Sequence, residues 1–276
     1  TLTIAHRTLT ASRREAAVLP ERPPGRAPRL ATIRHRWHRW HGWHGWHELP
    51  LREVALAWLA ARIVTGAAYA LAHYVSGQLD GARPASGTGM GSGSGADTGM
   101  GLTLTGLLGW DAGWYSGIAE HGYAGSGEQS LRFFPLLPLL VRAVTVLPGL
   151  GGHTGTGVAL VVLVNLIAFA FVTALARLAR HEGFDPAAVS RVIWLASLAP
   201  PAFVLVMGYT EALWGLLAVG VFAGIRTRRW ELAAACGLFA GLCRPVGILL
   251  IAPVALEAAR GITAAGATDR LRRAVA

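Results

Sequence analysis

Two apolar runs in this sequence are too long for the helices of an ordinary soluble domain. Residues 158–176 contain no charged side chain, and residues 54–75 contain one, Arg62, when His is counted as neutral. A helix rises about 1.5 Å per residue, so about 20 apolar residues cross a hydrocarbon core of about 30 Å. Because 53% of the chain is hydrophobic and only 14% is charged, we predict an all-α polytopic membrane protein.

The basic residues are distributed as in a membrane protein of fixed orientation. The formal net charge is +10, and since the chain has no Lys, every fixed positive charge is Arg. Ten Arg residues precede the first apolar run, and others flank the later runs. Such segments stay in the cytoplasm, so we expect a cytoplasmic N-terminus. The pattern argues against nucleic acid as a partner, because the charges follow the ends of apolar segments.

This distribution divides the chain into three regions. They are a disordered basic cytoplasmic arm (1–52), a transmembrane domain (53–260) with an outer loop at 76–153, and a cytoplasmic tail or the start of a missing C-terminal part (261–276). Gly-Ser repeats at 87–101 form a flexible tether in the outer loop. In the arm, His and Trp alternate from His35 to His47. The His residues would bind a transition metal, or the Trp and Arg residues would rest on the anionic inner leaflet of the membrane. We favour membrane contact and assign no metal.

The segment from Phe133 to Arg142 decides the topology of everything after it. Pro135 and Pro138 interrupt a straight helix. If the segment crossed the membrane, the next basic cluster would lie outside, against the charge rule, so we place the segment in the interface. Two hairpins then follow, at about 190–225 and 231–258, which reverse near Gly208 and at Arg244-Pro245. Every basic cluster now lies inside, and the outer turns dip into the membrane.

Arg62 falls inside the first membrane helix. A cation at the centre of such a helix costs about 2.5–3.5 kcal/mol on insertion scales. We therefore expect its side chain to face the bundle or to reach the interface, and to have a structural partner.

The predicted topology brings four polar residues from distant parts of the chain to the outer side: Asp111, Tyr209, Glu211 and Arg244. A carboxylate among aromatic rings at the interface suits the base that deprotonates a sugar acceptor, so Asp111 is the candidate catalytic residue. Helix capping and ion binding are its alternatives. Arg244 would bind a phosphate through paired hydrogen bonds, form an ion pair with Glu211, or do both. Direct sugar contact is a further role for Glu211.

Aromatic residues near Asp111 complete the candidate substrate site. Trp110, Trp114 and Tyr115 would stack on sugar rings or belong to an aromatic belt at the interface. His121 would share a proton or only form a local hydrogen bond, and Tyr209 precedes Glu211 in its turn. We assign no metal ligands and no organic cofactor, and leave a divalent cation open.

Several separated motifs resemble those of the PIG-V-like mannosyltransferases. They are Trp-Asp-Ala-Gly-Trp-Tyr at 110–115, Ile-Ala-Glu-His-Gly-Tyr at 118–123, Phe-Phe-Pro-Leu-Leu-Pro-Leu-Leu at 133–140, Ala-Pro-Pro-Ala-Phe at 199–203, Gly-Tyr-Thr-Glu-Ala-Leu at 208–213 and Arg-Pro-Val-Gly at 244–247. Their order and spacing also agree, and the resemblance spans about residues 54–258.

This resemblance implies a GT-C-like helical bundle with a large first extracytoplasmic loop. Eukaryotic members of the family add the second mannose of glycosylphosphatidylinositol anchors from dolichyl phosphate mannose. By resemblance, Asp111 is the catalytic position, and Glu211 and Arg244 lie near the site. The implied reaction is an inverting transfer from a polyprenyl phosphate sugar donor to a lipid or glycan acceptor. The absence of Lys together with abundant Arg, Ala and Gly suggests a bacterial gene and a plasma-membrane enzyme.

Two other classes of function stay open. A transporter or flippase for a lipid-linked substrate would also contain an intramembrane Arg and broken hairpins. A noncatalytic membrane subunit is the other alternative, because six proposed passes are fewer than the family has.

Overall fold

The computed structural model describes residues 50–81 and 106–261 of the chain. Within these two ranges all regular structure is helical, as predicted. The basic arm, most of the outer-loop tether and the C-terminal tail lie outside the described residues. The elements are α2 (Leu51–Gly81), α4 (Asp111–Gly125), η3 (Glu128–Arg132), α5 (Leu136–Thr145), α6 (Gly152–His181), α7 (Pro186–Leu198), η4 (Pro200–Leu205), α8 (Glu211–Arg226), α9 (Trp230–Cys243) and η5 (Pro245–Leu250), followed by helical residues 251–261.

Two helices, α2 and α6, have the length and apolar composition that a membrane crossing requires. The first predicted pass, 54–75, lies within α2, and the helix continues to Gly81, past the residue at which we predicted the outer loop to begin. The Ser and Gly residues after Val75 had suggested a loop. A single Gly costs a helix only about 1 kcal/mol, which a long helix tolerates.

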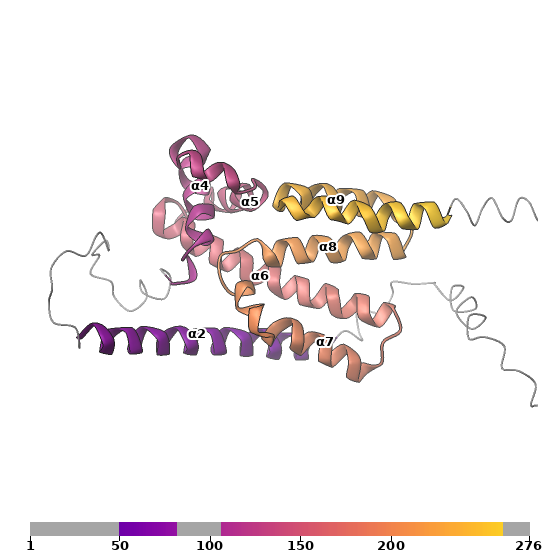
Figure 1. Ribbon diagram of the computed structural model, residues 1–276, viewed down its shortest axis with the longest axis horizontal. Helices are drawn as coiled ribbons and strands as arrows, with labels where there is room; N and C mark the ends of the chain where they lie inside the picture. Colours follow the sequence, from indigo (N-terminus) through magenta and orange to yellow (C-terminus); the bar gives the residue numbers. More distant parts are fainter. Residues whose placement is uncertain (1–49, 82–105, 262–276) are drawn as a thin grey trace, which may run out of the picture. The chain divides into compact units, whose positions relative to one another are not determined.

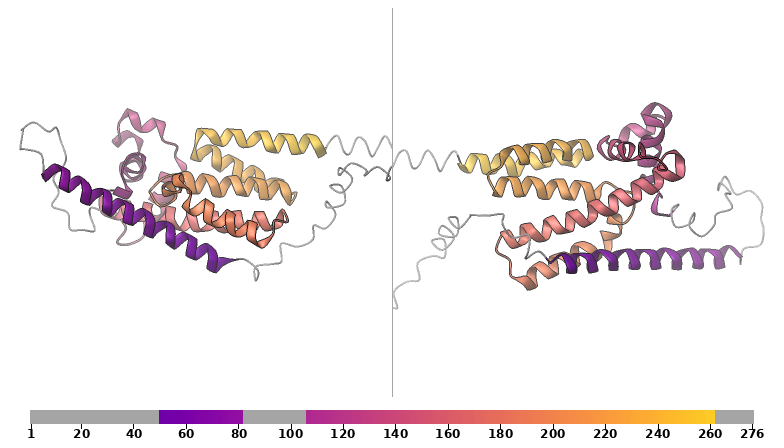
Figure 2. Two further views of the ribbon diagram at one scale, coloured as in Figure 1. Left: turned by 60° about the horizontal axis from the view of Figure 1, so that its bottom comes forward. Right: turned by 180° about the vertical axis from the view of Figure 1, so that it is seen from behind.

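Proline residues divide the second half of the chain into the two predicted hairpins. Helix α7 ends at Leu198, and Pro200 opens the short 3-10 helix η4; Pro245 opens η5 in the same way. Proline suits the first turn, where its missing N–H would have no intrahelical acceptor. Figures 1 and 2 show the chain reversing between η4 and α8, and again after α9, which ends at Cys243, so both predicted reversal points are confirmed.

The helices pack around α6 and α8. Figures 1 and 2 show α2 beside α7, and α9 with the C-terminal helical segment beside α8. Helices α4 and α5 lie against the first part of α6, where Leu137, Val141 and Leu160 are fully buried. Helix α5 has only ten residues, about 15 Å of helix. It is thus too short to cross a hydrocarbon core by itself.

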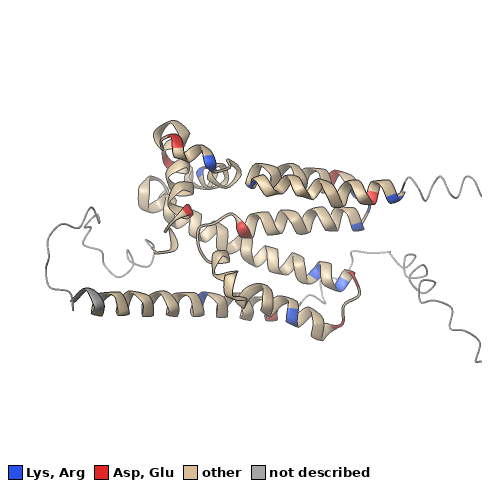
Figure 3. Ribbon diagram, in the orientation of Figure 1, with Lys and Arg blue, Asp and Glu red and all other residues tan. Residues whose placement is uncertain are grey.

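Charged residues occupy the ends of the bundle. Figure 3 shows basic segments where α6 and α8 finish, an end that we call the basic end. There Arg226 at the end of α8 forms a two-armed ion pair with Glu182, which follows α6. Arg228 lies 3.7 Å from Glu257. At the opposite end α8 begins and α9 finishes, and we call it the site end.

Candidate active site

An ion pair joins the tips of the two hairpins at the site end. Glu211 is the first residue of α8, and Arg244 directly follows α9. Arg244 Nη1 lies 2.5 Å from Glu211 Oε1, and both side chains are partly buried. A carboxylate also suits the positive end of the α8 dipole. The second oxygen, Glu211 Oε2, is buried and has no hydrogen-bond partner among the described residues, so it is available to accept a bond.

A buried tyrosine lies next to this pair. The Tyr115 hydroxyl is 3.5 Å from Thr210 Oγ1, and both residues are buried. Burial raises the pKa of Tyr115; the Thr210 hydrogen bond and Arg244 lower it, while Asp111 and Glu211 raise it. The net shift is upward, so the phenol stays protonated at neutral pH. Tyr115 therefore lies within the electrostatic reach of all three predicted charged site residues.

Asp111 is the exposed first residue of α4. The helix-capping alternative is not supported, because Trp110 holds the cap position and contributes no side-chain hydrogen bond. Trp110 has a φ of 53°, a conformation that costs a non-glycine residue about 1–3 kcal/mol. The chain thus turns sharply just before the candidate base.

The turn before α8 holds the loop that carries Asp111. The Gly208 N–H donates to the Leu107 carbonyl at 3.1 Å, and the Tyr209 hydroxyl donates to the Gly109 carbonyl at 3.5 Å. Burial raises the pKa of Tyr209, and Asp111 and Glu211 raise it further. These two hydrogen bonds join residues about 100 positions apart in sequence.

The aromatic residues have different surroundings. Trp114 stacks on Phe133, with ring centroids 5.6 Å apart and an interplanar angle of 16°, and Tyr115 meets Phe133 edge-on at 5.2 Å. Phe133 therefore packs against two of the predicted site residues, a contact that sequence reasoning missed. The side chain of Trp110 is 79% exposed, which leaves this ring the most accessible of the three to a sugar or headgroup.

His121 belongs to a different cluster. It lies ten residues after Asp111 on α4, about 15 Å along the helix, and its Nε2 is 3.9 Å from Glu120. Glu120 Oε2 is 3.2 Å from Nδ1 of His153, in the first turn of α6. The structure thus gives His121 a local partner and adds Glu120 and His153, which spacing alone did not connect. No trio of His, Cys, Asp or Glu suited to a metal occurs among residues 50–81 and 106–261.

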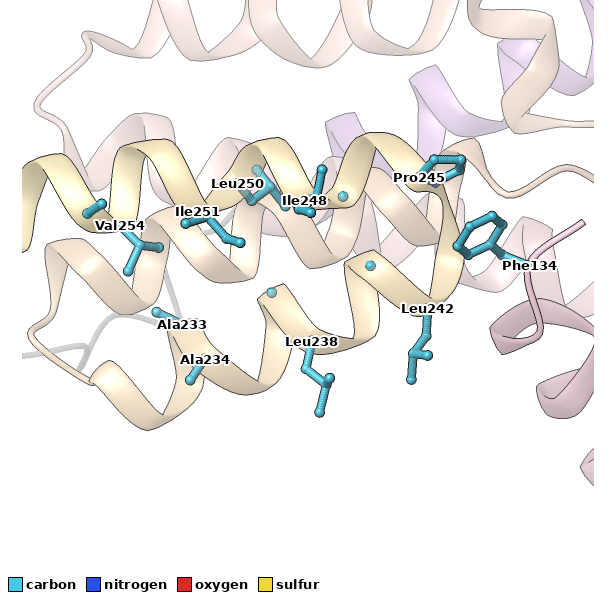
Figure 4. Close-up of a pocket in the computed structure, with 14 residues that line it drawn as sticks. Phe134, Ala233, Ala234, Leu238, Leu242, Pro245, Ile248, Leu250, Ile251 and Val254 are labelled. Atoms are coloured by element: carbon cyan, nitrogen blue, oxygen red, sulfur yellow. The ribbon is translucent and has the colours of Figure 1, made fainter. Parts of the chain in front are cut away.

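An apolar groove of about 790 Å³ is lined in part by Pro245, the residue after Arg244. It lies between α9 and residues 245–255, with Phe134 at one end beside Pro245 (Figure 4). Glycines line it, and Gly247 packs so closely on α9 that an added Cβ would lie 2.2 Å from the Ala240 carbonyl oxygen. Sequence reasoning missed this groove, although small residues recur in both of its walls.

Comparison with known protein families identifies the family of the chain. The sequence model of the family Mannosyltransferase (PIG-V) matches residues 90–260, more than half of the chain. The chain belongs to the PIG-V mannosyltransferase family. Searches of curated proteins and of solved structures found no match.

Membership of the PIG-V family confirms the resemblance seen in the sequence motifs. It supports a membrane glycosyltransferase that uses mannose, acting between a sugar donor and an acceptor. The matched range includes Asp111, Glu211 and Arg244, the three predicted charged site residues.

Gly208 provides a test of how closely this PIG-V site is packed. An added Cβ would lie 2.9 Å from Leu160 Cδ2 and 3.1 Å from Ala112 Cβ. We expect Gly208→Ala to lower stability by about 1–3 kcal/mol and transfer activity several-fold, because the turn must move away from the Asp111 loop. Thermal unfolding in detergent and a transfer assay measure the two effects. The matched control is Gly66→Ala in α2, where the new Cβ meets nothing within 4 Å; equal results for both variants would contradict the packing.

Proposed function

We propose that this PIG-V family member transfers mannose from a polyprenyl phosphate donor to a hydroxyl group of a lipid or glycan acceptor. The observation that carries the proposal is the Glu211–Arg244 pair at two hairpin tips, directly after the turn whose Gly208 and Tyr209 donate hydrogen bonds to the loop before Asp111. A carboxylate, a guanidinium and a nearby apolar groove are the groups that this reaction requires.

Asp111 is the proposed base. Its carboxylate takes the proton of the acceptor hydroxyl while the acceptor oxygen forms a bond to the anomeric carbon of mannose. The bond from that carbon to the phosphate oxygen breaks, and the electron pair leaves with the phosphate. Phosphate departs readily as an anion, so no general acid is required. The exposure of Asp111 at the first turn of α4 leaves the carboxylate accessible to an acceptor.

Arg244 is the proposed phosphate ligand. Its Nη1 contacts Glu211, and a guanidinium has further N–H donors that match two phosphate oxygens. Glu211 fixes the orientation of the guanidinium and offers Oε2 to a sugar hydroxyl. The apolar groove next to Pro245 would take the first isoprene units of the donor.

The proposed membrane placement follows from the two ends of the bundle. Helices α2 and α6 cross the bilayer, with the basic end in the cytoplasm and the site end outside. The short helices form re-entrant hairpins, whose broken backbone is tolerated where protein surrounds it. We propose a multi-pass protein of a bacterial plasma membrane with a cytoplasmic N-terminus.

A donor-labelling experiment tests the function. Membranes that contain the full chain receive polyprenyl phosphate [³H]mannose on their outer side, and label is followed in donor, acceptor and lumen. We expect label to leave the donor and appear in an acceptor fraction, at a level absent from control membranes. Movement of intact donor across the bilayer without transfer would instead identify a flippase. Donor binding with neither outcome would identify a noncatalytic subunit.

A further inference from the structure

A polar network crosses the interior of the bundle at Arg62. Its Nε donates to Asn165 Oδ1 in α6 at 2.8 Å, and its Nη2 donates to the Leu205 carbonyl at the end of η4 at 3.2 Å. The side-chain amide of Asn165 donates in turn to the Val206 carbonyl at 3.0 Å. The structural partners expected for Arg62 are thereby found, on two different elements.

Trp58 fixes the geometry of this network one turn earlier in α2. The Arg62 guanidinium carbon lies 4.3 Å from the Trp58 ring centroid, and Arg62 Nη1 donates to the Trp58 carbonyl at 3.0 Å. The indole N–H donates to the Asn165 carbonyl at 2.9 Å. With all three guanidinium nitrogens in use, Arg62 is held in one orientation.

The two carbonyls bound by the network stand where a helix breaks. Leu205 ends η4, and Val206 is its C-terminal cap. Carbonyls at a helix end lack intrahelical partners, and within a membrane each such group costs several kcal/mol if left unpaired. Arg62 and Asn165 supply the missing donors from α2 and α6. The re-entrant turn is thus fastened to two long helices rather than only to its own hairpin.

The same turn continues into the candidate active site. Two residues after Val206, the Gly208 N–H donates to the Leu107 carbonyl, and the Tyr209 hydroxyl donates to the Gly109 carbonyl. Both acceptors lie in the loop directly before Asp111. Glu211 follows at the start of α8. The network therefore binds the first two residues of the segment 205–211. The later residues of the same segment contact the loop before Asp111 and include Glu211.

We propose that Arg62 and Asn165 are positioning residues of the transferase site, which set the place of residues 205–211 and through them of Asp111 and Glu211. This inference rests on the proposed function. Its structural part, fixation of the turn, has a readout that needs no activity.

The kinetic arm compares Arg62→Gln and Arg62→Lys with the wild-type chain in membranes. Gln is too short to bridge α6 and η4, so we expect kcat to fall about 10- to 100-fold while the donor KM changes less than about threefold, since misplacement of reacting groups acts on the chemical step. Lys keeps the charge but lacks the several N–H donors of the guanidinium, so we expect kcat of Arg62→Lys to lie between those of Arg62→Gln and the wild type. The control, Arg191→Gln, changes an exposed Arg of α7 and should leave both constants unchanged.

The second arm measures the position of the turn directly. Met207 is buried and lies in the turn between Val206, which binds Asn165, and Gly208, which binds Leu107. It is changed to Cys in a chain whose Cys236 and Cys243 are replaced by Ala, and the rate of thiol labelling is measured. We expect Arg62→Gln to raise the labelling rate at least tenfold, and Arg62→Lys to raise it less. If wild-type membranes show no transfer but labelling rises, the proposed function fails and the fixation of the turn stands. Unchanged kcat and unchanged labelling in Arg62→Gln would overturn the positioning role.

Discussion

Replacement of Asp111 by Asn is expected to lower kcat for mannose transfer by a factor of about 10² to 10⁴, the usual contribution of a positioned general base. Asn has nearly the same shape as Asp but takes no proton at neutral pH. Because Asp111 is exposed and begins α4 without capping it, the change should leave folding and donor binding intact. Initial rates with labelled donor give kcat and the donor KM, and the amount of the variant protein in the membrane checks that it folds.

Asp185→Asn is the matched control for this prediction. Asp185 caps α7, and its side chain accepts a hydrogen bond from the Ala188 N–H at 2.8 Å. Asn is an equally good cap, so this variant should keep full activity. An Asp111→Asn enzyme that retained more than a tenth of wild-type kcat would remove Asp111 from the role of base.

Loss of Arg244 should have the second largest effect. Arg244→Ala removes the proposed phosphate ligand and leaves Glu211 as a partly buried carboxylate without its partner. A single preorganised donor to a developing anion contributes about 10²- to 10³-fold to kcat, and we expect a loss of this size. Arg244→Lys keeps one charge but not the paired geometry, and should recover only part of the rate.

A double-mutant cycle with Glu211→Gln separates the two roles of Arg244. If Glu211 only orients the guanidinium, the double variant should be no slower than Arg244→Ala alone, since the effects of contacting residues are not additive. Arg142→Ala, at an exposed Arg in the last turn of α5, serves as the charge-matched control. Equal activity of Arg244→Ala and the control would contradict phosphate binding at this position.

Local signals in the sequence were sufficient for the helical class and for the reversal points. Pro200, Gly208 and Pro245 act on the backbone within one or two residues of themselves, so the hairpins were predictable without tertiary information. The Glu211–Arg244 pair followed from these reversals, because each residue stands at a hairpin tip. The predicted roles of the site residues stay predictions that the variants above address.

The remaining features depend on contacts that no local pattern encodes. The stacking of Trp114 on Phe133, the Glu120–His153 pair and the groove beside Pro245 each join segments that approach only after the helices pack. The left-handed φ of Trp110 is likewise invisible in sequence, since Gly, Asn and Asp are the residues that normally signal it. Tertiary packing overrides the local preference at that point.

Helix α8 is anchored by opposite charges at both of its ends. Glu211 at its first residue holds Arg244, and Arg226 at its last holds Glu182. A slip of one helical turn, about 5.4 Å, would separate both pairs at once. Helix α8 therefore resists sliding along its own axis, and a carrier cycle that required such a stroke would have to break an ion pair at each end of the helix in every turnover.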